Sequence, residues 1–259
     1  MTKTTEEKLA ISLTAETTDL LPYLPYLLQD IWQLGSSPRD MIDLIKQHIA
    51  ISNSTKILDL GCGKGAVSIQ LAKALNVHVT GIDIIPEFIN TAQEKAKEWG
   101  VENLCEFHVG DIGKQPQTPS YDIIIYGAIG GVLGNPAQTL AFLKTMVKPG
   151  GYILLDDGYI DEENAEDVRY EYDYLTYDDW VKEFKNQGFK LITTKGNDEN
   201  LDNTENNTNI QKRAKELTTK YPDKKALFDS YVKSQMDESL DLETNTVTGV
   251  TWLIKKEGV

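Results

Sequence analysis

A glycine-rich turn between a strand and a helix is the strongest sign of chemistry in this sequence. Residues 56–65 read KILDLGCGKG, in which an apolar run meets glycines at alternate positions and a helical pattern follows at once. Glycine permits the sharp bend and lets a ligand approach the backbone without a Cβ in the way. The N–H groups at the start of the helix would face a negatively charged group of that ligand. The turn therefore predicts a binding site for a small ligand.

Acidic residues end the next two predicted strands. Asp83 follows Gly61 by about 20 residues, a spacing that suits a carboxylate accepting the hydroxyls of a ribose. Asp111 follows Gly110 at the end of the third strand. Open α/β sheets bind ligands where the carboxyl ends of their strands meet, so we expect the turn and both carboxylates to line one crevice. A simpler interpretation is that these residues only form tight turns in an α/β core. That interpretation does not explain why the glycine turn and the two acidic residues all lie at the ends of successive strands.

The turn admits two cofactors. Residues 61–66 also fit Gly-x-Gly-x-x-Ala, the dinucleotide pattern, which a later acidic residue completes. Asp59 separates the two, because a carboxylate just before the first glycine would repel the pyrophosphate of a dinucleotide. The same carboxylate suits the ammonium and the sulfonium of S-adenosyl-L-methionine. We therefore expect S-adenosyl-L-methionine as the cofactor, with a nicotinamide dinucleotide as the alternative.

Strands and helices alternate around these residues, which predicts an α/β fold with a parallel sheet and right-handed crossovers. The expected strands are 56–60, 77–83, 105–111, 121–129 and 152–157, and the expected helices between them are 64–75, 86–99 and 135–147, the last stopped by Lys148-Pro149-Gly150-Gly151. Later come a helix at 176–187, strands at 189–195 and 248–256, and helices at 210–220 and 223–238. Residues 197–209 are rich in Asn, Asp and Glu and are expected to form a mobile loop.

The beginning of the chain has a helical pattern of its own. Helices are expected at 20–33 and at 37–50, the second with Ser37 as its N-cap before Pro38. We therefore divide the chain into an N-terminal helical lid segment, 1–50, and a ligand-binding domain, 51–259, with a helical insertion at about 197–240.

Between residues 56 and 157 the motifs resemble those of the class I S-adenosylmethionine-dependent methyltransferases. The resemblance rests on LDLGCGKG, the GID acid, the GD pair, the apolar run YDIIIYGAI and KPGGYILL. It implies a doubly wound, mostly parallel seven-stranded sheet with helices on both faces. The last strand, TGVTWLIKK, would be antiparallel and lie at the sheet edge. No Asn-Pro-Pro-Tyr-like motif follows the fourth strand, so methylation of nucleobases or of glutamine loses support.

The resemblance also implies which residues hold the methyl donor. Listed from its methionine part through ribose and adenine to the methyl group, they are Asp59, Gly61, Gly63 and Gly65; then Asp83; then Ile84, Asp111 and Ile112; and last Tyr126 and Gly127.

Two clusters are candidates for the acceptor side. Asp156, Asp157 and Tyr159 follow the fifth predicted strand and are weak candidates for catalysis, the alternative being a solvated acidic loop. Tyr23, Tyr26 and Asp30 form a stripe on the first strong helix. They could belong to a lid that excludes water from the reaction, or they could simply face the solvent.

The composition limits the partners. The chain of 259 residues carries 40 acidic and 26 basic side chains, a net charge of −14, which disfavours nucleic acid because its affinity depends on Lys and Arg. Two cysteines and three histidines without ligand spacing predict no metal site. Neither a signal-peptide core nor a membrane-length apolar run is present, so we expect a cytoplasmic protein.

Methyl transfer to a small molecule is the function that these observations favour, with an amine as the expected nucleophile. A non-catalytic module that binds S-adenosylmethionine is the main alternative, and an NAD-dependent oxidoreductase is a weaker one. The acceptor, the methylated atom, any catalytic base and the oligomeric state stay open.

Overall fold

The chain forms two compact units in the computed structural model, which describes residues 3–161, 163, 166–169, 172, 174–196 and 203–258. The helical unit contains residues 1–31, 158–176 and 199–248, and the sheet unit contains residues 32–157, 177–198 and 249–259. This division differs from the predicted boundary at residue 50. The helix Pro38–His48 belongs to the sheet unit, because Met41, Leu44 and Ile45 are part of the core of the sheet.

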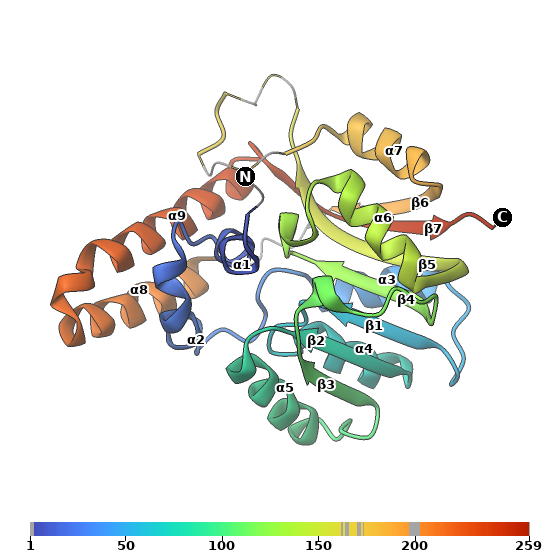
Figure 1. Ribbon diagram of the computed structural model, residues 1–259, viewed down its shortest axis with the longest axis horizontal. Helices are drawn as coiled ribbons and strands as arrows, with labels where there is room; N and C mark the ends of the chain where they lie inside the picture. Colours follow the sequence, from blue (N-terminus) through green and yellow to red (C-terminus); the bar gives the residue numbers. More distant parts are fainter. Residues whose placement is uncertain are drawn as a thin grey trace. The chain divides into compact units, whose positions relative to one another are not determined.

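The described residues form a seven-stranded sheet in the order β3-β2-β1-β4-β5-β7-β6 (Figure 1). The strands are β1 (Lys56–Leu60), β2 (His78–Asp83), β3 (Cys105–Val109), β4 (Tyr121–Gly127), β5 (Val147–Tyr159), β6 (Phe189–Gly196) and β7 (Thr248–Lys256). Pairs within the β3-β2-β1-β4-β5 run are parallel, whereas β6 and β7 are antiparallel. The predicted fold class is confirmed, and the carboxyl ends of β1, β2, β3, β4 and β5 meet at one edge.

Helices cover both faces of this sheet. They are α3 (Pro38–His48), α4 (Ala66–Leu75), α5 (Pro86–Glu98), α6 (Pro136–Met146) and α7 (Tyr177–Asn186). Successive strand residues point to opposite faces, so Ile57 and Ile123 join α3, α4 and α5 in one buried cluster. On the other face, Trp252 of β7 packs against Trp180 and Phe184 of α7.

A local signal starts α3 where the sequence predicts. The Ser37 hydroxyl accepts from the backbone N–H of Asp40 at 3.3 Å, and Pro38 occupies the first turn of α3. Ser37 is the predicted N-cap, and it connects the segment 32–36 to the start of α3.

The prediction for the fifth strand was too short. The segment Lys148-Pro149-Gly150-Gly151 lies inside β5, which begins at Val147 directly after α6 ends. Its pairing with β4 shifts register between Tyr121 and Ile123, so the glycines lie at an irregularity within the strand rather than in a loop.

The expected position of the last strand is also corrected. β7 lies between β5 and β6, and β6 occupies the sheet edge. The side chain of Trp252 is accordingly fully buried.

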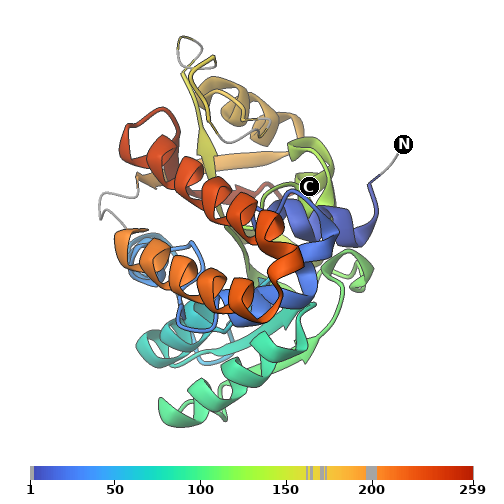
Figure 2. The ribbon, with the colours of Figure 1, turned by 90° about the vertical axis from the view of Figure 1, so that its left-hand side faces the viewer.

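The helical unit contains α1 (Thr5–Ser12), the 3₁₀ turn η1 (Thr18–Tyr23), α2 (Leu24–Leu27), α8 (Asn203–Lys220) and α9 (Lys225–Glu243). The helix predicted at 20–33 is wrong, because Pro22 and Pro25 remove backbone donors and leave a 3₁₀ turn and a short α2. α8 and α9 lie side by side (Figure 2). Residues 203–209 of the expected loop are helical, and residues 197–202 lie outside the described residues.

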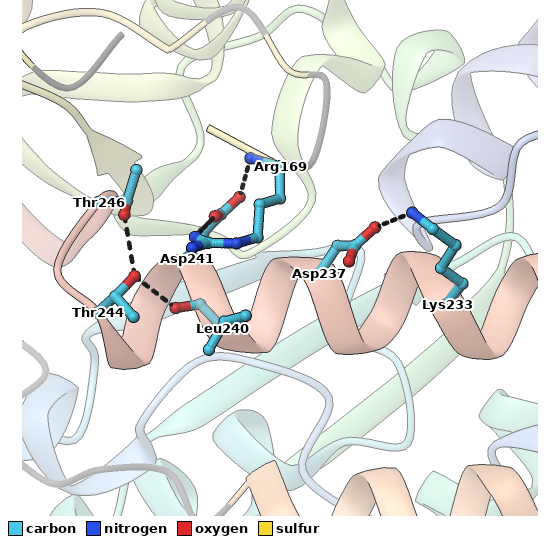
Figure 3. A network of polar contacts seen from close by, with 7 residues as sticks. All are labelled: Arg169, Lys233, Asp237, Leu240, Asp241, Thr244 and Thr246. Atoms are coloured by element: carbon cyan, nitrogen blue, oxygen red, sulfur yellow. Dashed lines mark hydrogen bonds and ion pairs between the residues drawn. The ribbon is translucent and has the colours of Figure 1, made fainter. Parts of the chain in front are cut away.

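A buried carboxylate secures the segment after β5 to α9. Asp241, 1% exposed, accepts from the backbone N–H of Arg169 and from its guanidinium, each at 2.8 Å (Figure 3). Thr244, just beyond the helix end, donates to the Leu240 carbonyl at 2.8 Å. In the part of the chain that the structure describes, no helix is both long and apolar enough to span a bilayer.

Candidate functional site

The glycine turn after β1 has the backbone that only glycine adopts readily. Gly61, Gly63 and Gly65 have φ values of +70°, +52° and +75°. A Cβ on Gly61 would lie 2.7 Å from a methyl carbon of Ile129, so the space beside this residue is closed as well. The predicted tight turn is therefore present, and side chains at these positions would strain it.

Gly65 differs from the other two glycines in what it faces. A Cβ there would lie 2.9 Å from Ala92 and from Phe107, which belong to the packing between α5 and β3. Gly65 is the residue that precedes α4. It brings the helix close to the sheet, whereas Gly61 and Gly63 line the pocket described next.

A pocket opens over the turn, entirely within the sheet unit. Its lining comes from the end of β1, the turn, the start of α4, the end of β4 and the segment before α3: Asp59, Gly61, Cys62, Gly63, Lys64, Ala66, Val67, Ile125, Gly127, Trp32, Gln33, Leu34 and Ser36. Thus Asp59, Gly61, Gly63 and Gly127 of the predicted site come together.

The segment 32–36 was missed at the sequence level. The indole Nε1 of Trp32 donates to the Lys64 carbonyl at 3.0 Å, and its ring packs on Trp99 with centroids 5.3 Å apart. These contacts hold the segment beside the glycine turn. The sequence signal that could have indicated this segment is a Trp followed by a Gly-Ser-Ser run directly before a capped helix. Nothing in that signal specifies that the segment packs against the glycine turn.

Asp59 is a buried carboxylate at the floor of the pocket. It is 3% exposed and accepts from the Ser68 hydroxyl at 2.5 Å. Burial raises its pKa to about 6, the negative charge of Asp83 acts in the same direction, and the Ser68 hydrogen bond opposes them. No Lys or Arg of the described residues forms an ion pair with it. A cationic group of a ligand would stabilise this charge.

Asp83 ties the end of β2 to the glycine turn. Its two carboxylate oxygens accept from the backbone N–H groups of Gly63 and Ile85, each at 2.9 Å. Burial raises the pKa of Asp83, and these backbone donors oppose the shift. The carboxylate is thus fixed beside the glycine turn, and it is not among the residues that line the pocket. Ile84, next to it, is half-buried.

Asp111 and Ile112 lie at the carboxyl end of β3. The Asp111 side chain accepts from the backbone N–H of Gly113 at 2.9 Å and pairs with Lys114 at 3.3 Å. Ile112 is buried and begins the 3₁₀ turn η2 (Ile112–Lys114). Their position at a strand end agrees with the prediction, but neither lines the pocket.

Tyr126 and Gly127, the two residues predicted to border the methyl group, lie at the end of β4 but have different surroundings. The Tyr126 hydroxyl donates to the Gly130 carbonyl at 2.7 Å, and burial raises its pKa. It therefore supports the loop after β4. Gly127 lines the pocket, and a Cβ there would lie 2.4 Å from the Ser36 hydroxyl oxygen.

Asp156 pairs with Gly127 in the register between β4 and β5. It is 5% exposed, so the expectation of a solvated loop does not describe it. Burial raises its pKa to about 7, Asp157 and Asp40 raise it further, and the Ser36 hydroxyl opposes them. Asp157 and Tyr159 are half-buried, and Tyr159 bridges to Leu175 within the helical unit.

The aromatic and acidic stripe of the N-terminal segment is engaged within the helical unit. The Tyr26 hydroxyl donates to Glu216 at 2.6 Å, and Asp30 accepts two hydrogen bonds from Arg213 at 2.6 and 2.8 Å. The Tyr23 ring packs edge-on against Phe228 at 5.2 Å between centroids. The three side chains therefore hold the segment before residue 32 on α8 and α9.

No metal centre emerges within the described residues. They bring together no group of three His, Cys, Asp or Glu side chains that could hold an ion.

Comparison with known proteins agrees with this geometry. A family model described as a methyltransferase domain matches residues 51–216. Over 168 residues the chain is 32% identical to the hybrid PKS-NRPS synthetase thnA of Trichoderma harzianum, an alignment that covers 60% of this chain and 4% of that protein. Over 100 residues it is 32% identical to the ubiquinone biosynthesis O-methyltransferase of Aeromonas salmonicida, covering 39% of this chain and 42% of that protein. The matches thus span less than half the length of either relative.

Among solved structures, an S-adenosylmethionine-dependent methyltransferase from Geobacter sulfurreducens, in complex with S-adenosyl-L-homocysteine, superposes with a TM-score of 0.72 at 18% identity. The match covers 90% of this chain and 97% of that one. It confirms the fold.

Proposed function

Because the chain belongs to the methyltransferase domain family, we propose that this protein is an enzyme that transfers a methyl group from S-adenosyl-L-methionine to a small molecule. The observation that carries the proposal is Asp59, a buried carboxylate in a pocket over a three-glycine turn. A buried carboxylate needs a cationic partner, and S-adenosylmethionine brings both an ammonium and a sulfonium. A dinucleotide would instead place a pyrophosphate beside the carboxylate.

The remaining residues of the site fit the other parts of this donor. Gly61 and Gly63 would lie under its amino-acid end, with Asp59 near the ammonium. Asp83 has lone pairs left for the ribose hydroxyls after accepting two backbone hydrogen bonds. For the adenine we keep Ile84, Asp111 and Ile112 as a proposal, and for the surroundings of the methyl group Tyr126 and Gly127, of which Gly127 reaches the pocket.

When bound, the donor supplies a methyl group on a positively charged sulfur, which leaves as a neutral thioether. The protein must then hold the acceptor in line and exclude water, and such positioning supplies roughly 7–11 kcal/mol. The segment 32–36, held beside the glycine turn by Trp32, is suited to closing this end of the site.

We propose a neutral or cationic acceptor with an amine as the nucleophile. Positive charge moves from sulfur to nitrogen as an amine is methylated, and fixed carboxylates stabilise that charge in the transition state. Asp156 and Asp157 supply carboxylates at the end of β5, next to β4, where Gly127 lines the pocket. The net charge of −14 favours the approach of a cation over an anion.

We keep as a proposal that the N-terminal segment of the helical unit acts as a lid during methyl transfer. Tyr23, Tyr26 and Asp30 hold its N-terminal segment on α8 and α9, so the segment could move together with these helices.

The test is a metabolite extract incubated with isotope-labelled S-adenosylmethionine and the full chain, followed by mass analysis of the labelled product. A labelled small molecule supports the proposal. Binding of S-adenosyl-L-homocysteine without any labelled product would favour the non-catalytic binding module. A thermal shift with NAD and none with either adenosyl ligand would overturn the cofactor assignment.

A further inference from the structure

Two buried oxygen atoms lie close together at the end of β4, one from Ser36 and one from Asp156. Within the described residues, neither the Ser36 hydroxyl oxygen nor the Oδ2 atom of Asp156 makes a well-formed hydrogen bond, although the hydroxyl lies close enough to the carboxylate to lower its pKa. The two residues are only 6% and 5% exposed. Burying polar atoms without well-formed hydrogen bonds is destabilising, so this arrangement indicates that a ligand completes it.

Their position connects them to the pocket. Ser36 and Gly127 both line it, together with Asp59 and the glycine turn. The Ser36 hydroxyl occupies space that is open only because residue 127 is glycine, since a Cβ on Gly127 would lie 2.4 Å from the hydroxyl oxygen. Asp156 stands opposite Gly127 in the sheet, and its backbone carbonyl accepts from the N–H of Ala128 at 3.0 Å. The strand pairing therefore fixes the carboxylate behind the end of the pocket.

The charges around Asp156 distinguish it from the neighbouring acids. Asp40 of α3 has a cationic partner, because the Lys195 ammonium of β6 lies 2.6 Å from its carboxylate and 3.0 Å from that of Asp43. Asp156 forms no ion pair within the described residues. It faces the negative charges of Asp40 and of Asp157 on its own strand. Asp156 therefore lacks the cationic partner that Asp40 and Asp43 share in Lys195.

We propose that Ser36 and Asp156 bind the nucleophilic group of the methyl acceptor and that Asp156 accepts its proton. The proposal deepens the proposed function and rests on it. The reacting group carries an N–H or O–H, which Ser36 orients by a hydrogen bond. The proton of that group passes to the Asp156 carboxylate, and the nitrogen or oxygen bonds the methyl carbon as the carbon–sulfur bond breaks. The sulfur keeps the electron pair of the broken bond, and the neutral Asp156 later releases the proton to water.

The protonation behaviour of Asp156 suits this role. A general base works best when its pKa lies near the operating pH, and burial raises the pKa of Asp156 to about 7. The acceptor class that follows is a small molecule whose nucleophile must lose a proton, namely an amine or a hydroxyl compound. Thioethers and other nucleophiles without a proton would have no use for the base.

The first test is carbon NMR of the aspartate carboxyl groups in the ligand-free full-length protein. We expect one signal that titrates near pH 7 and is absent from Asp156→Asn. Ser36→Ala should raise its pKa, because the hydroxyl lowers it, and Asp157→Asn should lower it, because that charge raises it. The exposed residues Ser54 and Asp178 provide the matched controls Ser54→Ala and Asp178→Asn, which should leave it unchanged.

The second test is transfer of labelled methyl groups into the metabolite extract as a function of pH. We expect the wild-type rate to rise through about pH 7, and Asp156→Asn to lose that rise and about 100-fold in rate. Ser36→Ala should lose rate with its pH profile displaced upward, and both controls should keep the wild-type rate. Affinity for S-adenosyl-L-homocysteine, measured by calorimetry, should be retained in Asp156→Asn and in both controls, whose residues do not line the pocket.

An Asp156 signal that titrates near pH 4 would overturn the proposal, as would full activity in Asp156→Asn and Ser36→Ala. Failure of the wild-type protein to bind S-adenosyl-L-homocysteine would instead overturn the proposed function. Should Asp156→Asn not fold, as judged by its melting temperature, the Ser36→Ala titration and rate profile decide alone.

Discussion

Replacing Asp59 by asparagine should make the ligand-free sheet unit more stable and the donor site weaker. Burial raises the pKa of Asp59 from 3.8 to about 6. Since the folded state then binds the proton more tightly than the unfolded state, stability decreases as the pH rises from the unfolded pKa through the folded one. At about 1.4 kcal/mol per pKa unit, the charged form costs the folded state about 3 kcal/mol above about pH 7.

Asparagine keeps the size of Asp59 and can accept the Ser68 hydrogen bond, but it carries no charge. The wild-type carboxyl is mostly neutral in the folded protein at about pH 5 and ionised at about pH 8. The advantage of the variant in free energy of unfolding should therefore grow by about 1.4 kcal/mol between these pH values. Asp156 titrates in both proteins and cancels in the comparison. Loss of the charge opposite the ammonium should weaken donor binding by about 1.5–3 kcal/mol.

Urea unfolding followed by tryptophan fluorescence measures the stability of the relevant unit, because all four tryptophans, Trp32, Trp99, Trp180 and Trp252, belong to the sheet unit. Calorimetry with S-adenosyl-L-homocysteine measures the site. A stability difference that does not change with pH would refute the argument from burial. Unchanged ligand affinity would remove Asp59 from the donor site.

Three further substitutions test the turn, the ribose contact and the helical unit. Asp83→Ala should weaken S-adenosyl-L-homocysteine by about 1.5–3 kcal/mol in calorimetry, and unchanged affinity in a folded variant would mean that the ribose lies elsewhere. Gly61→Ala should lower the free energy of unfolding by roughly 1–3 kcal/mol in urea, since φ is +70° and Ile129 closes the space; a neutral result would contradict the assigned backbone. Arg213→Ala removes the two hydrogen bonds that Arg213 donates to Asp30, and it should reduce the rate of methyl transfer more than the affinity for the donor. A normal rate of transfer would indicate that Tyr23, Tyr26 and Asp30 take no part in the reaction.

The sequence determined the layers of the fold and the position of the glycine turn. Apolar runs such as that of β4, glycines at a strand end and a cap such as Ser37 act over a few residues, so they are readable locally. Asp59, Gly61, Gly63 and Gly127, which the resemblance implied as donor-binding residues, line one pocket in the structure, and their roles stay a proposal.

Some local signals were overridden when the chain packed. The Pro-Gly-Gly run after α6 suggested a loop, yet it lies within β5, because the pairing with β4 continues across a shift in register. β7 was expected at the edge and lies inside the sheet, since strand order depends on which buried faces fit together rather than on the strand itself.

Only the tertiary structure brought Ser36 next to Asp156. One residue precedes the first strand of the sheet and the other ends the fifth, and each type is common on protein surfaces. Their chemistry comes from burial beside Gly127, where a hydroxyl and a carboxylate lose water and no Lys or Arg of the described residues pairs with the carboxylate. Desolvation and hydrogen-bond satisfaction depend on neighbours from distant segments, so no local pattern could have shown them.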